Sequence, residues 1–435
     1  MRTIITSIVA VLIAGVIGAG VFFYPSLRDT GLQGSGYAAK NICSGHFVSG
    51  FPADQVMDEA LRPVAPPLAL ARYEVDEEER SVDVTLLHGL FRRRAVHRPG
   101  IGCTLLASGE QSPRFDVAPI QSLASPTNDP WPRGEGPGND TMEGVDYAAL
   151  KAAIDGAFSD PDPTLRRHTK AVVVAYRGEL IAERYADGVT QATPLIGWSM
   201  SKSVTQAQIG ILVHEGLVDL NSPPPVPEWA GEGDARAAIT LDQLLRMSSG
   251  LAFDETYAVG TDVMRMLSQE PDAGAFATEM PLEHEPGAHW SYSSGTTNLL
   301  SRMIRRVVGG STQDHYLFAQ ENLFLPLRAS SFRLEPDASG TFIGSSYSYA
   351  TARDWARLGQ LYLQDGTWEG RRILPEGWVE YSRTPTPNNP RRNYGAHFWV
   401  NAEPEPGHEV SGFAPMWPEA PRDAFAMNGF RASTS

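Results

Sequence analysis

The sequence predicts a mixed α/β (α+β) protein in which a small N-terminal region precedes a larger domain. Three observations support this prediction. An uncharged apolar segment opens the chain, residues 38–110 contain strand-like runs such as Ser81–Leu86, and a hairpin pattern followed by helices comes after a Pro- and Gly-rich stretch. At 435 residues the chain is long enough for two or three domains.

The charge balance excludes one class of partner. The net charge is −15 and the isoelectric point is near 5.1. A nucleic-acid-binding protein needs a basic face, so we expect no nucleic-acid partner. The short basic run Arg92-Arg93-Arg94 is interpreted as a solvated strand end or turn, with a polybasic contact to a membrane as the alternative.

The N-terminus has the pattern of a membrane helix. Ile4–Tyr24 comprises 21 consecutive uncharged residues, which is enough to cross a bilayer, and Arg2 before it favours a cytoplasmic N-terminus. We therefore expect an uncleaved signal anchor over residues 1–24, with the rest of the chain exported. The alternative is a cleaved signal peptide, since Gly18 and Gly20 are small enough for a cleavage site.

The two cysteines, Cys43 and Cys103, both follow the apolar segment. In an exported domain an isolated pair most often forms a disulfide, and two cysteines alone make a poor metal site. We expect this disulfide within an N-terminal extension over residues 25–124.

Residues 125–140 are rich in Pro, Gly and Asp, which predicts a linker, and residues 141–435 then form the main domain. That domain is expected to open with a helix over 147–158 and a hairpin of strands 171–176 and 180–185. A helix from Ser199 to about Glu215 should follow, ended by Gly216. Further helices are expected over 241–247, 296–308, 352–363 and 375–381.

The pair Ser199 and Lys202 is the strongest chemical signal. The chain has four lysines among 36 basic residues, which leaves 32 arginines, so a lysine three residues after a serine is notable. The two side chains share one face of a helix, and an amine, unlike a guanidinium, can lose its proton and activate a hydroxyl. The alternative is an ordinary N-cap serine followed by a solvated lysine.

A second group must return the proton to the leaving atom. Tyr292, in Tyr292-Ser293-Ser294 just before an amphipathic run, could present a phenol to the same cleft. Taken alone, Tyr292 would be interpreted as an aromatic loop residue packed on the core.

Together these motifs resemble the serine β-lactamase-like family, which contains class C β-lactamases, penicillin-binding DD-peptidases, esterases and 6-aminohexanoate-dimer hydrolases. The resemblance covers roughly residues 145–431. It rests on Ser199-x-x-Lys202, Leu244–Leu251, Tyr292–Gly295, Ser346–Arg357, Leu374–Trp378 and Tyr394–Trp399.

The resemblance implies an antiparallel sheet flanked by helices plus an all-helical subdomain. It implies that Ser199 is the acylated nucleophile, Lys202 its base and Tyr292 the proton carrier to the leaving group. Ser294 would orient the lysine or the substrate, and Gly429, in the late strand segment 424–431, would contact the substrate. It implies neither a cofactor nor a metal, and His284 and His289 are interpreted as surface groups.

The function implied is a serine hydrolase that cleaves a small-molecule amide or ester through an acyl-enzyme, similar to a 6-aminohexanoate-dimer hydrolase or an esterase. A β-lactamase or DD-peptidase of the cell envelope is the first alternative, although no clear Lys-Thr-Gly is present to hold a β-lactam carboxylate. The second alternative is an inactive envelope binding or sensor domain. The expected location is the bacterial inner membrane, with the catalytic domain in the periplasm, or secretion after signal cleavage.

One departure from the family pattern lies at the end of the chain, where 432–435 stand in place of an expected glycine. We expect a chain that lacks the family's last strand and helix. A sheet edge left unpaired invites association, so such a chain should be poorly soluble or inactive.

Overall fold

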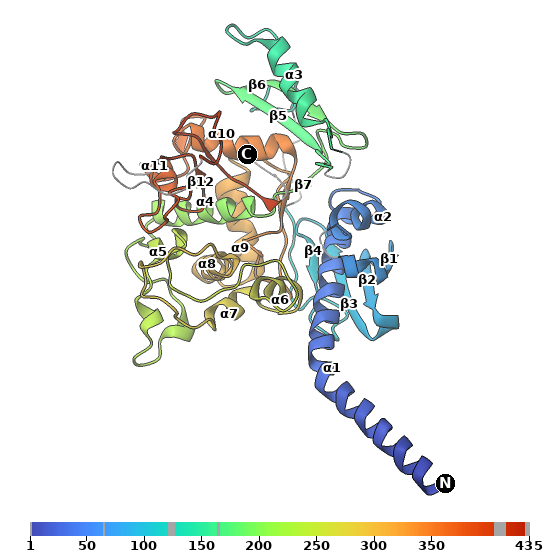
Figure 1. Ribbon diagram of the computed structural model, residues 1–435. Helices are drawn as coiled ribbons and strands as arrows, with labels where there is room; N and C mark the ends of the chain where they lie inside the picture. Colours follow the sequence, from blue (N-terminus) through green and yellow to red (C-terminus); the bar gives the residue numbers. More distant parts are fainter. Residues whose placement is uncertain (1, 64–65, 121–126, 163–165, 404–414, 431–435) are drawn as a thin grey trace.

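The computed structural model describes residues 2–63, 66–120, 127–162, 166–403 and 415–430, with side chains from Tyr24 onward except at 66, 67 and 88. Figure 1 shows the N-terminal helix and its sheet on one side of a larger helical body, with a hairpin and one helix at its upper end. The predicted mixed α/β fold is confirmed. The expected departure at the end of the chain falls on residues outside the described ones.

The N-terminal region consists of one long helix against an antiparallel sheet. Helix α1 (Arg2–Phe47) is followed by a short α2 (Ala53–Val56), and the sheet has the order β1-β2-β3-β4. Its strands are β1 (Arg72–Asp76), β2 (Ser81–Leu86), β3 (Phe91–Arg98) and β4 (Gly102–Leu105). Close packing of the helix on β3 requires a residue without a side chain, because a Cβ at Gly31 would lie 2.1 Å from the Phe91 ring.

The predicted disulfide is confirmed and joins this helix to this sheet. Cys43 on α1 bonds Cys103 on β4, sixty residues apart in the sequence. Both cysteines are fully buried among the apolar residues that fill the space between helix and sheet.

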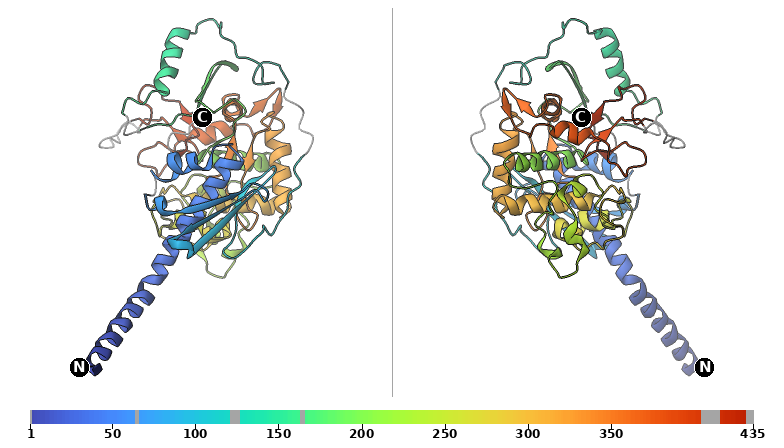
Figure 2. Two further views of the ribbon diagram at one scale, coloured as in Figure 1. Left: turned by 90° about the vertical axis from the view of Figure 1, so that its right-hand side faces the viewer. Right: turned by 90° about the vertical axis from the view of Figure 1, so that its left-hand side faces the viewer.

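The apolar segment 4–24 is continuous with the rest of α1, although Pro25 lies within the helix. Figure 2 shows the N-terminal half of α1 extending away from the body of the protein. Within the described part of the chain, no helix meets the length and hydropathy required to cross a bilayer. The expected transmembrane helix is therefore not supported by the structure.

The prediction that the basic run is solvated is wrong at its centre. Arg93 is 3% exposed, and its guanidinium donates to the carbonyl oxygens of Ser268 and Leu106 at 2.8 and 2.9 Å. Ser268 ends α6 (Asp262–Ser268), so Arg93 joins the N-terminal sheet to the helical body. Arg92 and Arg94 lie on the other face of β3, because successive side chains of a strand point to opposite faces.

The larger part of the chain begins as predicted. Helix α3 (Tyr147–Ala157) precedes the hairpin β5 (Ala171–Tyr176) and β6 (Glu179–Tyr185). The two turn residues, Arg177 and Gly178, have φ of 49° and 83°, which is the left-handed pair that a two-residue hairpin turn requires. The residues predicted to form a linker lie against α10 (Ala352–Leu363), because Arg353 donates to the Glu135 carbonyl at 2.8 Å.

The remaining helices surround one extended core. Their bounds are α4 (Met200–His214), α5 (Leu241–Leu245), α7 (Ala273–Thr278), α8 (Ser294–Val307), α9 (Thr312–Ala319) and α11 (Trp378–Arg383). All the helices expected between residues 141 and 435 are present, within three residues at each end. Helices α5 to α9 form the helical side of the body in Figure 1.

The sheet of this part is divided rather than continuous. The short strands pair as β7-β9-β8, β10-β11 and β12-β13, and the hairpin β5-β6 forms its own ladder among the described residues. The bounds are β7 (Leu195–Ile196), β8 (Arg333–Leu334), β9 (Ser348–Ala350), β10 (Thr367–Trp368), β11 (Arg371–Arg372), β12 (Trp399–Val400) and β13 (Phe425–Ala426). All the pairings are antiparallel, as expected.

Candidate active site

Ser199 lies at the turn between β7 and α4, where it is the N-cap of the helix. The preceding residue, Trp198, has φ of 47°, a left-handed conformation that a bulky side chain rarely adopts. This sharp turn places Ser199, which is partly exposed, at the positive end of the helix dipole. The position suits a nucleophile whose attack creates negative charge beside it.

Lys202 lies one turn further along α4 and is 1% exposed. Its Nζ lies 3.3 Å from Ser199 Oγ, 2.9 Å from Ser294 Oγ and 3.1 Å from the carbonyl oxygen of Ser345. Burial lowers the pKa of Lys202 to about 8, against a smaller opposing effect of Glu255. The solvated-lysine alternative is therefore wrong, and burial favours the neutral amine.

Tyr292 lies immediately before α8, whose first turn is capped by the Ser293 hydroxyl. The centre of its ring is 4.8 Å from Lys202 Nζ. Burial raises the pKa of Tyr292 well above its ordinary value, with a further rise from Tyr394, whereas a hydrogen bond with Ser199 opposes that rise. The phenol is therefore protonated at neutral pH and can act as a donor.

Two aromatic rings pack against Tyr292. Tyr394 meets it edge-on at 5.5 Å, and Trp399 lies 5.4 Å away at a tilted angle. Both belong to the segment Tyr394–Trp399, whose resemblance to the family was noted above. Because this ring cluster restricts the tyrosine, the phenol keeps one position relative to Ser199.

Ser294 is the first residue of α8 and is fully buried. Its hydroxyl accepts from Lys202 and donates to Glu255 Oε1 at 2.6 Å, while its backbone N–H donates to Glu255 Oε2 at 2.7 Å. Sequence reasoning missed both Glu255 and the Ser345 carbonyl. Neither has a sequence signal of its own, because each reaches the site only through folding.

The last described residues also reach this region. The ring of Phe430 stacks on Tyr257 at 5.6 Å and lies edge-on to Trp198 at 6.0 Å. The Phe430 ring therefore packs on the residue that precedes Ser199. A contact of Gly429 with substrate stays a prediction.

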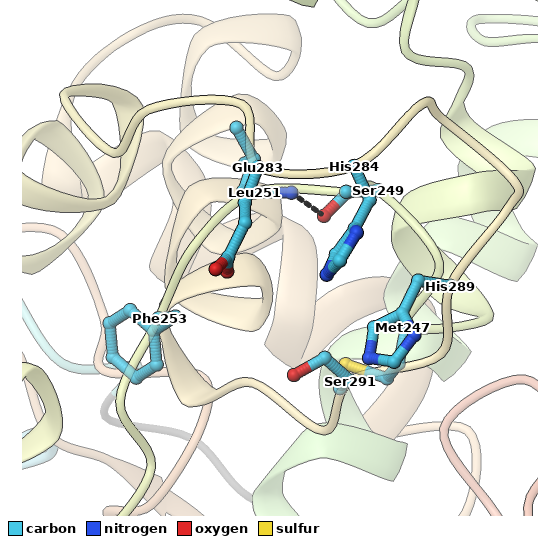
Figure 3. Close-up of a pocket in the computed structure, with 9 residues that line it drawn as sticks. Met247, Ser249, Leu251, Phe253, Glu283, His284, His289 and Ser291 are labelled. Atoms are coloured by element: carbon cyan, nitrogen blue, oxygen red, sulfur yellow. Dashed lines mark hydrogen bonds between the residues drawn. The ribbon is translucent and has the colours of Figure 1, made fainter.

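A small pocket adjoins the loop that carries Tyr292. It encloses about 60 Å³, and Figure 3 shows Glu283, His284 and Ser291 turned toward a common space. The rings of His284 and His289 lie 4.3 Å apart and are exposed, as expected of surface groups. Within the described ranges, no group of three or more His, Cys, Asp or Glu side chains is arranged to hold a metal ion.

The sequence model of the Beta-lactamase family matches residues 154–429, which include every candidate catalytic residue. The chain belongs to the Beta-lactamase family. A 6-aminohexanoate-dimer hydrolase of Paenarthrobacter ureafaciens is 27% identical to it over 234 residues, which is 49% of this chain and 56% of that protein. The chain thus spans little more than half the length of this curated relative.

Two solved structures resemble the chain more distantly. A putative 6-aminohexanoate-dimer hydrolase from Bacillus anthracis has a TM-score of 0.49 at 22% identity, covering 65% of this chain and 71% of that one. A D-stereospecific amidohydrolase from Streptomyces sp. has a TM-score of 0.45 at 20% identity, covering 59% and 83%.

Proposed function

We propose that this protein is a serine hydrolase that cleaves an amide or ester through an acyl-enzyme on Ser199. The observation that carries the proposal is the approach of Lys202 Nζ to Ser199 Oγ at 3.3 Å, with the amine buried and its pKa lowered to about 8. A buried lysine of this kind is a general base, whereas an exposed ammonium is not. Family membership and the related 6-aminohexanoate-dimer hydrolase support the same chemistry.

The proposed reaction has two halves. The neutral Lys202 amine takes the Ser199 hydroxyl proton, and the oxygen attacks the substrate carbonyl carbon to give a tetrahedral intermediate. The N-terminus of α4 stabilises the negative charge on the carbonyl oxygen. The protonated Tyr292 phenol donates its proton to the leaving amine or alcohol and is reprotonated by Lys202. Water then cleaves the acyl-enzyme with the same groups acting in reverse.

The experiment that tests this proposal is active-site labelling with a fluorophosphonate, followed by mass spectrometry of the peptides. We expect the adduct on the peptide that contains Ser199, and no adduct in Ser199→Ala. The matched control is Ser222→Ala, because Ser222 is exposed and distant in sequence from every candidate catalytic residue. An adduct on another serine, or none at all, overturns the proposal.

The proposed location is the bacterial inner membrane, with the catalytic part in the periplasm. Support comes from the 21 uncharged residues Ile4–Tyr24 and from the Cys43–Cys103 disulfide, since disulfides persist in oxidising compartments. Digestion of spheroplasts with a protease tests it. We expect the chain to be degraded in intact spheroplasts, and full protection of the chain would contradict this location.

A further inference from the structure

Glu255 lies beside the proposed catalytic centre without contacting Ser199. It belongs to the loop between α5 and α6, and both of its carboxylate oxygens accept from Ser294, one from the hydroxyl at 2.6 Å and one from the backbone N–H at 2.7 Å. An ionised carboxylate can accept on both oxygens, whereas a side-chain amide has one accepting oxygen and an NH₂ group that only donates. The Ser294 hydroxyl therefore donates its only proton to Glu255.

This hydrogen bond determines whether Ser294 donates to Lys202 or accepts from it. A hydroxyl has one proton, so with that proton on the Glu255 side the Ser294 oxygen can only accept from the amine, at 2.9 Å. The Ser345 carbonyl, 3.1 Å from Nζ, can also only accept. A neutral lysine has two N–H donors and one lone pair. The two acceptors take the donors, and the lone pair is left for the third neighbour, Ser199 Oγ at 3.3 Å.

We propose that Glu255 is a positioning residue that orders the proton of Ser294, so that the lone pair of Lys202 faces Ser199. Without this carboxylate the Ser294 hydroxyl is free to turn and donate its proton to the lone pair, which would block the base. The inference rests on the proposed function, because it assigns Lys202 as the base. Since Glu255 acts only through Ser294, it is not itself a catalytic residue.

Glu255 also places a negative charge near the Lys202 amine, with the Ser294 hydroxyl between the two groups. Its charge raises the pKa of Lys202, against the larger lowering by burial. Burial raises the pKa of Glu255 in turn, and the Lys202 charge and the two Ser294 donors oppose that rise. The other titratable groups around this centre are Asp254, whose charge raises the pKa of Glu255, the protonated Tyr257, Tyr292 and Tyr394, and the buried, neutral His397.

The composition of the chain allows a direct measurement. Lys40, Lys151, Lys170 and Lys202 are the only lysines, so incorporation of ¹³Cε-lysine gives four side-chain signals. Lys202→Arg assigns the signal of interest by its disappearance. The pH titration of that signal reports the Lys202 pKa without any turnover.

In Glu255→Gln we expect the Lys202 titration midpoint to move down by about one pH unit, the smaller end of the effect of a nearby opposite charge. We also expect at least about a tenfold slower fluorophosphonate labelling at the high-pH plateau, because one Ser294 contact must be lost to the amide. The matched control is Glu215→Gln, which removes an exposed carboxylate at the C-terminal end of α4 and should change neither quantity.

The two readouts separate the outcomes. An unchanged Lys202 midpoint in Glu255→Gln overturns the inference, whatever happens to labelling. A lowered midpoint with unchanged plateau labelling also overturns it, because the charge then acts without ordering the lone pair. Absence of labelling in the wild-type chain contradicts the proposed function, while the midpoint shift would still establish the coupling of Glu255 to Lys202.

Discussion

The Lys40 ammonium donates to the Glu335 carboxylate at 2.6 Å, and both side chains are fully buried. Lys40 belongs to α1 and Glu335 directly follows β8, so the pair joins the N-terminal helix to the larger part of the protein. Ser44 Oγ and the backbone N–H of Cys103 also donate to this carboxylate, at 2.8 and 2.6 Å. Burial alone would favour the neutral forms of both groups, and these donors are what make the ionised carboxylate tolerable.

We predict that Lys40→Met lowers the free energy of unfolding by about 3–5 kcal/mol, because the variant leaves a buried carboxylate without its counter-ion. Urea denaturation followed by tryptophan fluorescence measures the change. Lys151→Met is the matched control, since Lys151 is 77% exposed and forms a surface ion pair with Asp155. Equal midpoints for the two variants would show that the buried pair adds nothing to stability.

Lys202→Arg should be nearly as inactive as Lys202→Ala. Arginine keeps the positive charge but cannot accept the Ser199 proton, so the turnover of either variant should fall by at least about 10²-fold. The measurement is the rate of hydrolysis of a chromogenic ester by the purified variants. A near-normal rate in Lys202→Arg would assign the proton to another group, with Tyr292 the first candidate.

The pH dependence of activity follows from the direction of the Lys202 shift. Its pKa is lowered to about 8, and only the neutral amine is competent, so kcat/KM should rise with pH through a midpoint near about pH 8 and level off at higher pH. An unperturbed lysine would place the midpoint above about pH 10. A profile that is flat between pH 6 and 9 would exclude Lys202 as the base.

The Cys43–Cys103 disulfide closes a loop of sixty residues. In the loop-entropy model such a crosslink stabilises the folded chain by about 4 kcal/mol, so the double variant Cys43→Ser/Cys103→Ser should unfold at a clearly lower urea concentration. Adding reductant to the wild-type protein should reproduce part of that loss, and should not affect the double variant. If reductant shifted both proteins equally, the crosslink would not be the cause.

Local sequence determined the elements near the site. The hairpin turn Arg177-Gly178, the helix α10 and the placement of Ser199 at the start of α4 all agree with the patterns of nearby residues. Helices and tight hairpins are formed by contacts within a few residues, so their signals lie within the same short segment. For the same reason, the spacing of Ser199 and Lys202 predicted that they share one helix face.

The tertiary structure alone decided how these groups are protonated and held. Glu255 and Ser294 are 39 residues apart, and Ser345 and Lys202 are 143 apart. Arg93, interpreted from the sequence as solvated, is buried because a carbonyl 175 residues away accepts from it. A pKa or a buried charge depends on the groups that surround it from every side. Those groups come from distant segments, so a sequence names the chemical groups of a site and the folded chain sets their charge and orientation.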